Sequence, residues 1–140
     1  MSIQRKTILT IIVVGGGLGY YLWNLPREFW TLSRIVGLLI TIPAFALWAT
    51  ARIQLGNSFA LRAKATELVT HGLYSKFRNP VYVFGTLVII GVLLAVGKPT
   101  WLLILLIVIP LQITRARREA RILEQFFGDS YRKYRDGTWF

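Results

Sequence analysis

The sequence predicts an all-α membrane protein with about four transmembrane helices and a cytoplasmic, amphipathic C-terminal helix. The 140 residues are 54% hydrophobic and only 16% charged. The apolar residues form four blocks without a charged side chain, and most basic residues lie in the segments that flank them. A soluble domain of this length has too little interior to bury four such blocks.

The four blocks comprise residues 8–23, 35–51, 81–96 and 101–114. A transmembrane helix needs about 20 apolar residues, with about 17 as the lower limit. The first two blocks reach this length once their interfacial neighbours are included, whereas the last two are short. Gly97 and Pro99 between the short blocks favour a tight turn. Residues 81–114 are therefore predicted to form a helical hairpin, whose second helix continues into the basic segment beyond Thr114.

Glycines are concentrated in the first block, at Gly15, Gly16, Gly17 and Gly19. A nucleotide-binding glycine loop would need a preceding strand and a soluble βαβ unit, which this block does not offer. Small residues let two membrane helices approach closely. We therefore expect these glycines to pack against a neighbouring helix.

The distribution of positive charge predicts the orientation in the membrane. If there are four spans, all 17 Lys and Arg residues except Arg27, Arg34 and Lys98 lie on one side. Basic residues are enriched in cytoplasmic segments. The sequence thus predicts an integral, multi-pass protein of the inner or plasma membrane, with both termini and the 52–80 loop in the cytoplasm. Binding to nucleic acid would not explain this segregation by side, and no nucleic-acid partner is expected.

Composition also excludes several kinds of chemistry. Because the chain has no cysteine, it has no disulfide framework, thiolate metal site or cysteine nucleophile. His71 is the only histidine, and we expect it to be a turn or interface residue. No metal site is predicted.

The polar residues that suggest a function lie in the 52–80 loop and in the tail, residues 115–140. The loop is longer than a simple connector requires, and loops of that kind are usually functional. The tail begins as a helix, because apolar side chains recur at helical spacing until a glycine that favours a helix end. These positions are Ala116, Ala120, Leu123 and Phe127, followed by Gly128.

Two local patterns have both a structural and a functional interpretation. Arg115 and Glu119 are four residues apart and share a helix face. They form either a surface ion pair or a binding pair at the mouth of the helix bundle, and the spacing alone leaves both open. Asn79-Pro80 is a typical helix start, with Asn79 as the N-cap. Capping alone does not require the neighbouring Arg78 and Tyr82.

These segments resemble, in order and spacing, the integral-membrane methyltransferases that include isoprenylcysteine carboxyl methyltransferase and the phospholipid N-methyltransferases. The resemblance covers residues of about 55–135. Two positions depart from the family pattern, because Asn79 replaces the usual His and Ala120 replaces the second Glu of an acidic pair. The matching segments are Leu68-Val69-Thr70-His71-Gly72-Leu73-Tyr74, Arg78-Asn79-Pro80-Val81-Tyr82, Arg115 with Glu119, and Phe127-Gly128-Asp129-Ser130-Tyr131-Arg132-Lys133-Tyr134.

The resemblance implies one membrane methyltransferase domain over residues 1–140, with S-adenosylmethionine as cofactor. It assigns Glu119 to the polar groups of the cofactor and Arg115 to the acceptor, and these two would be the catalytic residues. Further cofactor contacts would come from Glu67, Leu68, Val69, Tyr74, Asn79, Pro80 and Tyr82.

The acceptor implied by the resemblance is lipidated or lipid-like and is reached from the membrane. Arg115 favours carboxyl O-methylation of an isoprenylcysteine-like substrate, because the related enzyme uses its matching Arg for a carboxylate. Methylation of a phospholipid or another amine is the alternative. Two further alternatives are a non-catalytic membrane protein that keeps the fold, and a basic adaptor that binds anionic lipid.

Overall fold

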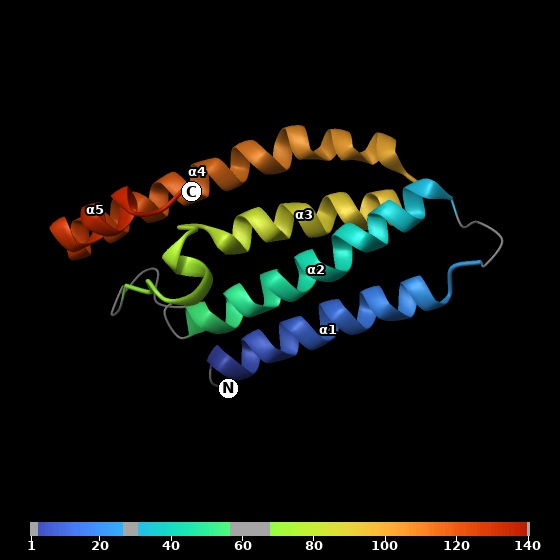
Figure 1. The fold of residues 1–140 in the computed structure, drawn as a ribbon, viewed down its shortest axis with the longest axis horizontal. Coiled ribbons are helices and arrows are strands. Elements are labelled where there is room, and N and C mark those ends of the chain that lie inside the picture. The colour runs from blue at the N-terminus through green and yellow to red at the C-terminus, as the bar shows by residue number, and fades with distance from the viewer. Residues whose placement is uncertain (1–2, 27–30, 57–67, 140) are drawn as a thin grey trace.

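The computed structural model describes residues 3–26, 31–56 and 68–139, and within these ranges all regular secondary structure is helical (Figure 1). The elements in chain order are α1 (Ile3–Trp23), α2 (Leu32–Leu55), the 3-10 helix η3 (Gly72–Ser75), α3 (Pro80–Ala95), the 3-10 helix η4 (Pro99–Ile104), α4 (Leu105–Phe127) and α5 (Asp129–Asp136).

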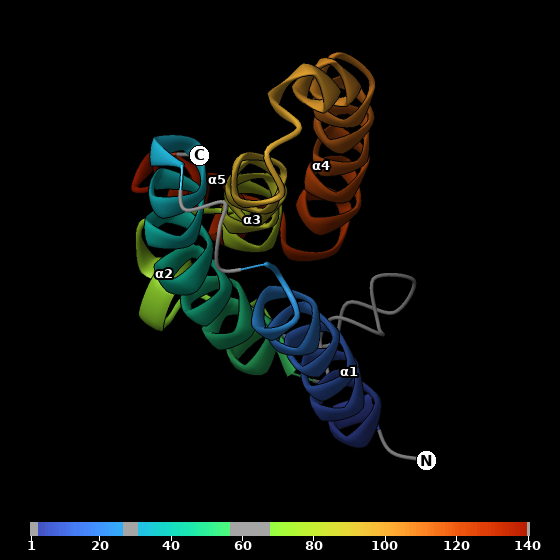
Figure 2. The ribbon, with the colours of Figure 1, turned by 90° about the vertical axis from the view of Figure 1, so that its right-hand side faces the viewer.

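The four long helices lie side by side, and consecutive helices run in opposite directions (Figure 1). A second view shows α3 between α2 and α4, while α1 packs on α2 (Figure 2). The N-terminal end of α1, η3 and α5 share one end of the bundle. The turn between α3 and η4 lies at the opposite end. This arrangement brings the two segments with the predicted functional residues to the same end.

Three helices in the described part of the chain are long and apolar enough to cross a membrane, namely Gln4–Trp23, Leu32–Leu55 and the continuous η4–α4 segment Pro99–Phe127. The remaining apolar helix, α3, has 16 residues and is about 24 Å long, shorter than a typical hydrocarbon core of about 30 Å. Three of the predicted spans thus have the length and composition that crossing a membrane requires. Four spans remain a prediction.

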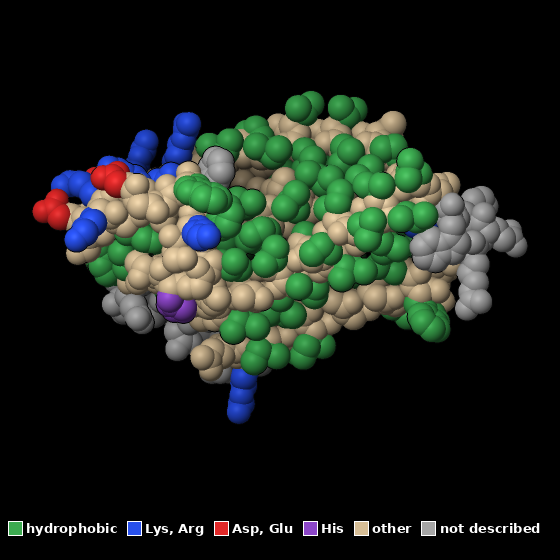
Figure 3. All heavy atoms as spheres, viewed as in Figure 1, with side chains coloured by type: hydrophobic (Ala, Val, Ile, Leu, Met, Phe, Trp, Pro, Cys, Tyr) green, Lys and Arg blue, Asp and Glu red, His purple; other side chains and the backbone are tan. Residues whose placement is uncertain are grey.

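On the face seen in Figure 3, apolar side chains cover the middle of the bundle, and charged ones gather at the end that carries α5. No residue of α4 is buried, and Leu106 on this helix is 73% exposed. Helices that expose such side chains along their length are suited to a lipid environment.

Several predicted boundaries change in the structure. Helix α2 continues through Leu55, so the connection to α3 begins later than residue 52. As expected, the fourth helix does not end at Thr114 and continues to Phe127. It ends at Gly128, whose φ of 53° is in the region that favours glycine. The predicted tight turn is also present, with Gly97 at φ 74°.

The centre of the bundle is the contact between α2 and α3, where small residues let the backbones approach closely. A Cβ added at Gly37 would lie 2.6 Å from the carbonyl oxygen of Gly91. One added at Gly91 would lie 2.7 Å from the backbone nitrogen of Thr41. Both distances are too short for a real contact, so only glycine permits this spacing.

The expected close packing of the α1 glycines is wrong for three of the four. A Cβ added at Gly16, Gly17 or Gly19 would have no neighbour within 4 Å. Of the four, only Gly15 faces another helix, because a Cβ added there would lie 3.0 Å from the Phe45 ring. The glycines that do bring helices together are Gly37 and Gly91. Gly37 is the only glycine of α2, and Gly91 lies six residues from Gly85 in α3, so local glycine density does not reveal the interface.

A buried arginine closes the α2–α3 pair at the end away from α5. Arg34 is 8% exposed, and its guanidinium donates from Nε to the carbonyl of Ala95 at 3.2 Å and from Nη1 to that of Pro26 at 3.1 Å. The Ser33 hydroxyl donates to the carbonyl of Leu94 at 2.9 Å. The bonds to Leu94 and Ala95 satisfy carbonyls in the last turn of α3, which have no partner within the helix.

Candidate functional site

The segment that precedes α3 is anchored by Tyr74. This residue is 5% exposed and forms a buried cluster with Ala51 of α2 and Val81 of α3. Val69 and Leu73, from the same segment, pack against the cluster. The first matching segment of the sequence is thereby fixed to the ends of α2 and α3.

Gly72 allows the chain to turn into this position. Its φ is 61°, and a Cβ there would collide with the Gln54 side chain. The Gln54 amide oxygen accepts a hydrogen bond from the backbone nitrogen of Leu73 at 2.9 Å. A larger residue at position 72 would therefore oppose both the backbone conformation and this bond.

The C-terminal segment folds back over the same loop. Tyr134 of α5 donates its hydroxyl to the carbonyl of Tyr74 at 2.7 Å, and the backbone nitrogen of Trp139 donates to the carbonyl of Lys76 at 2.8 Å. The rings of Phe77 and Trp139 meet edge to face at 5.9 Å between centroids. Two segments about 60 residues apart in sequence thus form one unit at this end of the bundle.

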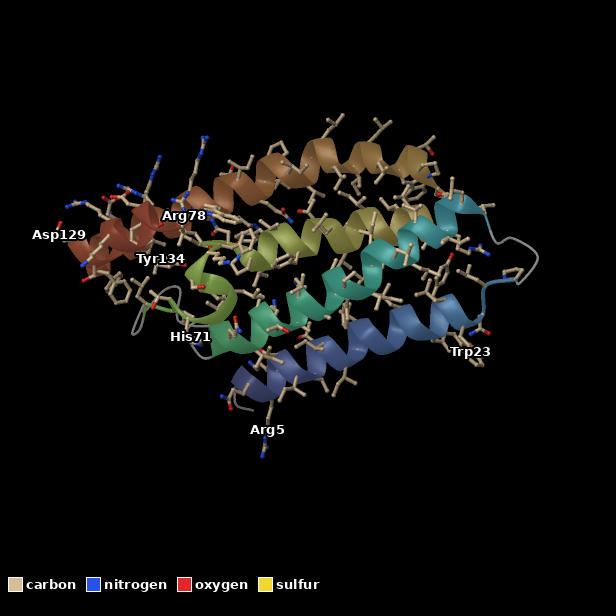
Figure 4. All side chains as sticks on the ribbon, viewed as in Figure 1. Arg5, Trp23, His71, Arg78, Asp129 and Tyr134 are labelled. Atoms are coloured by element: carbon tan, nitrogen blue, oxygen red, sulfur yellow. The ribbon has the colours of Figure 1, made fainter. Side chains whose placement is uncertain are left out.

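Arg78 lies at the same end of the bundle as Tyr134 (Figure 4) and interacts with Tyr131 of α5. Tyr131 is 3% exposed. Burial raises the pKa of the Tyr131 hydroxyl, and the positive charge of Arg78 offsets part of that increase. The Nε atom of Arg78 is buried and has no hydrogen-bond partner within the described ranges. Arg78 is therefore a half-buried cation with one buried donor, Nε, that is unused within the described ranges.

Helix α3 begins immediately after Arg78. Asn79 occupies the N-cap position and Pro80 the first helical position, as predicted, and Pro80 is fully buried. The expected capping bond is absent, however, because the Asn79 side chain accepts no hydrogen bond from the helix. With ψ at 54° rather than in the extended region, Asn79 lacks the usual cap geometry. Its amide instead lines a groove between α3 and α4.

Tyr82, in the first turn of α3, reaches across to α4. Its hydroxyl donates a short hydrogen bond to the Glu119 carboxylate. Both side chains are half-buried. A tyrosine and a glutamate that are 37 residues apart, and that belong to two of the matching segments, therefore meet at the end of the bundle that carries η3 and α5.

The groove extends from this pair toward the middle of the bundle and has a volume of about 400 Å³. One turn beyond Tyr82, the Thr86 hydroxyl lies 2.7 Å from Oε1 of Gln112 on α4 and 2.8 Å from the carbonyl of Tyr82. The lining residues are Asn79, Tyr82, Val83, Thr86, Leu87, Ile109, Gln112, Ile113 and Ala116.

Thr86 and Gln112 were not among the residues predicted from the sequence, although spacing indicates both. Thr86 follows Tyr82 by four residues, so the two share a face of α3. Gln112 is the only amide in the apolar block 101–114 and precedes Glu119 by two helical turns. Polar side chains inside an apolar membrane segment usually mark a functional path.

The other predicted site residues have different surroundings. Leu68 and Val69 are half-buried, and the Tyr74 ring is enclosed in its cluster. Arg115 is exposed on α4, one turn before Glu119, and does not line the groove. Glu67 lies outside the described residues. Their roles toward cofactor and acceptor stay predictions.

His71 is exposed next to η3 (Figure 4). Over residues 3–26, 31–56 and 68–139, no group of three or more His, Asp or Glu side chains is arranged to hold a metal ion. The polar chemistry of the site therefore rests on Asn79, Tyr82 and Glu119, with Arg78 close by in sequence.

Fold and site together define a helical membrane protein with a polar centre at one end of a groove between two helices. The family model for phospholipid methyltransferases matches residues 29–130. The chain belongs to this family, which supports methyltransferase activity on lipid-like substrates at a membrane. No curated protein and no solved structure gives a significant match.

Proposed function

We propose that this protein is an S-adenosylmethionine-dependent methyltransferase that modifies the polar head of a membrane lipid. The single observation that supports this most strongly is the Tyr82–Glu119 pair at one end of the α3–α4 groove. It combines polar groups for a cofactor with an apolar path for a lipid chain. Family membership supplies the reaction class.

The polar groups of the site fit the cofactor by their chemistry. S-adenosylmethionine carries a carboxylate, an ammonium group, two ribose hydroxyls and an adenine ring. Glu119 contributes a carboxylate at this end of the groove and would accept from hydroxyls or from the ammonium group. The Asn79 side chain makes no capping hydrogen bond to α3, and Arg78 has a buried Nε donor that is unused within the described ranges. These two groups would meet the remaining polar atoms.

When bound, the cofactor supplies an activated methyl group for an in-line displacement. The chain itself has to orient the acceptor, exclude water and hold Glu119 in place. Tyr82 does the last of these, because its hydroxyl donates directly to the carboxylate. Residues 68–79 and α5 cover the same end of the bundle, which limits access of water.

We favour an amine head group as the acceptor, as in a phospholipid. An amine must be neutral to accept a methyl group, and nearby positive charge lowers the pKa of an amine. Four arginines of α4 lie within four residues of Glu119 in the sequence, namely Arg115, Arg117, Arg118 and Arg121. The second candidate is carboxyl O-methylation of an isoprenylcysteine-like acceptor. Arg115 supports it, because this residue precedes Glu119 by one helical turn and a guanidinium binds carboxylates well.

The same proposal includes the topology. The N-terminal end of α1, the segment around η3, and α5 share one end of the bundle, and the basic residues concentrate there. With basic segments toward the cytoplasm, both termini and the site face the cytoplasm, where S-adenosylmethionine is available.

The first test is calorimetric binding of S-adenosylmethionine to the detergent-purified protein. We expect the wild type to bind and Glu119→Ala to lose binding. Glu124→Ala is the matched control, because Glu124 lies on the same helix but pairs with Arg132 at 2.8 Å on the surface. A folded wild type that does not bind the cofactor, or a Glu119→Ala variant that binds normally, would contradict the proposal.

Arg115→Lys distinguishes the two acceptors. If Arg115 clamps a carboxylate, lysine keeps the charge but loses the two-point contact. Turnover on carboxyl acceptors should then fall about tenfold or more, with cofactor affinity unchanged. With an amine acceptor, the same substitution should change turnover less than about threefold.

A further inference from the structure

We propose that Gln112 and Thr86 form a recognition site inside the groove for an oxygen atom of the acceptor lipid, and that this oxygen is the carbonyl of an ester-linked acyl chain. The inference rests on the proposed function and names the feature of the acceptor that the groove selects. It starts from a hydrogen-bond count at Gln112.

The Thr86 hydroxyl has one hydrogen but lies within bonding distance of two oxygens, the Tyr82 carbonyl at 2.8 Å and Gln112 Oε1 at 2.7 Å. If the hydrogen points to Gln112, both amide hydrogens of Gln112 are left over. If it points to Tyr82, the amide of Gln112 turns and gives one hydrogen to Thr86, and one is left over. In either arrangement, at least one N–H of Gln112 has no partner among the described residues.

An unused N–H is unfavourable in this location. Gln112 lines the groove together with Val83, Leu87, Ile109 and Ile113, all of them apolar. A donor that faces apolar surroundings without a partner loses the hydrogen bonds it would make in water. An acceptor atom on the molecule that fills the groove restores them.

The depth of Gln112 fits an ester carbonyl. Arg115 is the first charged residue after the apolar part of α4, and Gln112 precedes it by three residues, or about 4.5 Å along the helix. Lipid ester groups lie at this level, between the polar head groups and the hydrocarbon core. Deeper in the core, a lipid chain offers no oxygen.

The distance to the polar centre agrees with the same group. Gln112 and Glu119 are seven residues apart on one helix, or about 10 Å. In a phospholipid with an ethanolamine head, about ten bonds separate the amine nitrogen from an ester carbonyl oxygen. At about 1.2 Å per bond for an extended chain, they span at most about 12 Å. Between its α-carbon and its isoprenyl chain, an isoprenylcysteine has only a thioether sulfur, which is a weak acceptor.

The test compares two phosphatidylethanolamines that have the same head group and chain length, one ester-linked and one ether-linked. The protein is reconstituted in nanodiscs with S-adenosylmethionine, and methyl transfer to each lipid is measured. We expect the wild type to prefer the ester lipid about tenfold in kcat/KM, because the ether lacks the carbonyl. Gln112→Leu, which is similar in size, should reduce this preference to about twofold or less.

Gln125→Leu is the matched control, since Gln125 is exposed on the same helix and outside the groove. It should keep the wild-type preference. Thr86→Val, which removes the hydroxyl that contacts the Gln112 amide, should lower the preference for the ester lipid to a value between those of the wild type and Gln112→Leu. Equal transfer to both lipids by the wild type, or an unchanged preference in Gln112→Leu, would overturn the inference while leaving the methyltransferase proposal intact.

A second measurement keeps the two proposals separate. The delipidated protein is mixed with each lipid, and lipid retention is measured by native mass spectrometry without cofactor. Preferential retention of the ester lipid, lost in Gln112→Leu, would support the groove site even if no methyl transfer were detected. Absence of cofactor binding and transfer would refute the proposed function alone. Equal retention of both lipids by the wild type would refute the groove site.

Discussion

The close contact of α2 and α3 makes Gly91→Ala the most informative test of the fold. A Cβ at Gly91 would lie 2.7 Å from the backbone nitrogen of Thr41 and 2.9 Å from the carbonyl oxygen of Gly37, and it would also collide with the Thr41 hydroxyl. Rotation of the Thr41 side chain relieves only the last of these contacts. Backbone atoms cannot move aside, so the two helices must separate.

The magnitude follows from these distances. An ordinary contact for a Cβ begins at 3.4 Å, so α2 and α3 must move apart by about 0.7 Å. A gap of this size forfeits a quarter to a half of the dispersion energy of the atoms that face each other. Overpacking of this kind costs about 1–3 kcal/mol. The higher helix propensity of alanine returns about 0.5–1 kcal/mol, which leaves a net loss of about 1–2 kcal/mol.

Gly85→Ala provides the comparison on the same helix. Its Cβ would lie 3.5 Å from the Trp48 ring, which is an ordinary contact, so this variant should equal or slightly exceed the wild type in stability. In thermal melts of the detergent-purified protein, we expect Gly91→Ala to melt about 4–8 °C lower than Gly85→Ala. If Gly91→Ala melts at or above Gly85→Ala, the close helix approach is not a real feature of the fold.

Two further predictions concern the ends of the bundle. Burial, reinforced by the neighbouring Tyr131, raises the pKa of Tyr134 to about 12. The unfolded chain then loses this proton first, so the free energy of unfolding should fall as pH rises from about 10 to about 12. Tyr134→Phe should lower the free energy of unfolding by about 1 kcal/mol at neutral pH. Above pH 10, the free energy of unfolding of this variant should decline less steeply than that of the wild type. Parallel pH profiles of the two melting temperatures would contradict this. At the opposite end, Arg34→Met should cost about 1.5–3 kcal/mol, because charged donors to the carbonyls of Ala95 and Pro26 are lost. Arg34→Lys should recover only part of that loss, and a wild-type melting temperature for Arg34→Met would refute the capping role.

The long elements of the fold could be predicted from the sequence because each rests on a local signal. Apolar blocks mark the helices, Gly97 and Pro99 mark the turn between α3 and η4, and Gly128 marks the end of α4. The α2–α3 interface could not be predicted in this way. Gly37 and Gly91 differ from the α1 glycines only in what lies opposite them, and that depends on how the helices pair.

The candidate site was predictable to the same extent. Asn79, Tyr82 and Glu119 were predicted as site residues from the sequence, and in the structure Tyr82 and Glu119 form a hydrogen bond. It did not indicate that the Asn79 side chain leaves the helix cap and lines the groove. That outcome depends on the backbone angles of Asn79, whose ψ of 54° departs from the usual cap geometry. Thr86 and Gln112 were missed although their spacing from Tyr82 and Glu119 indicates them, because only the structure shows that they face each other.

The two helices that form the groove are packed against the rest of the bundle to different degrees. Helix α3 is fixed on one side by its glycine contact with α2 and by the Arg34 cap. Helix α4 has no buried residue, so little apolar packing holds it to the bundle. The Tyr82–Glu119 and Thr86–Gln112 bonds connect it directly to α3, while α5 connects its end to the segment before α3. Polar pairs of this kind are directional, so they set the separation of α3 and α4 at two levels of the groove. The residues proposed to recognise the cofactor and the lipid oxygen are thus the same residues that set the width of the groove.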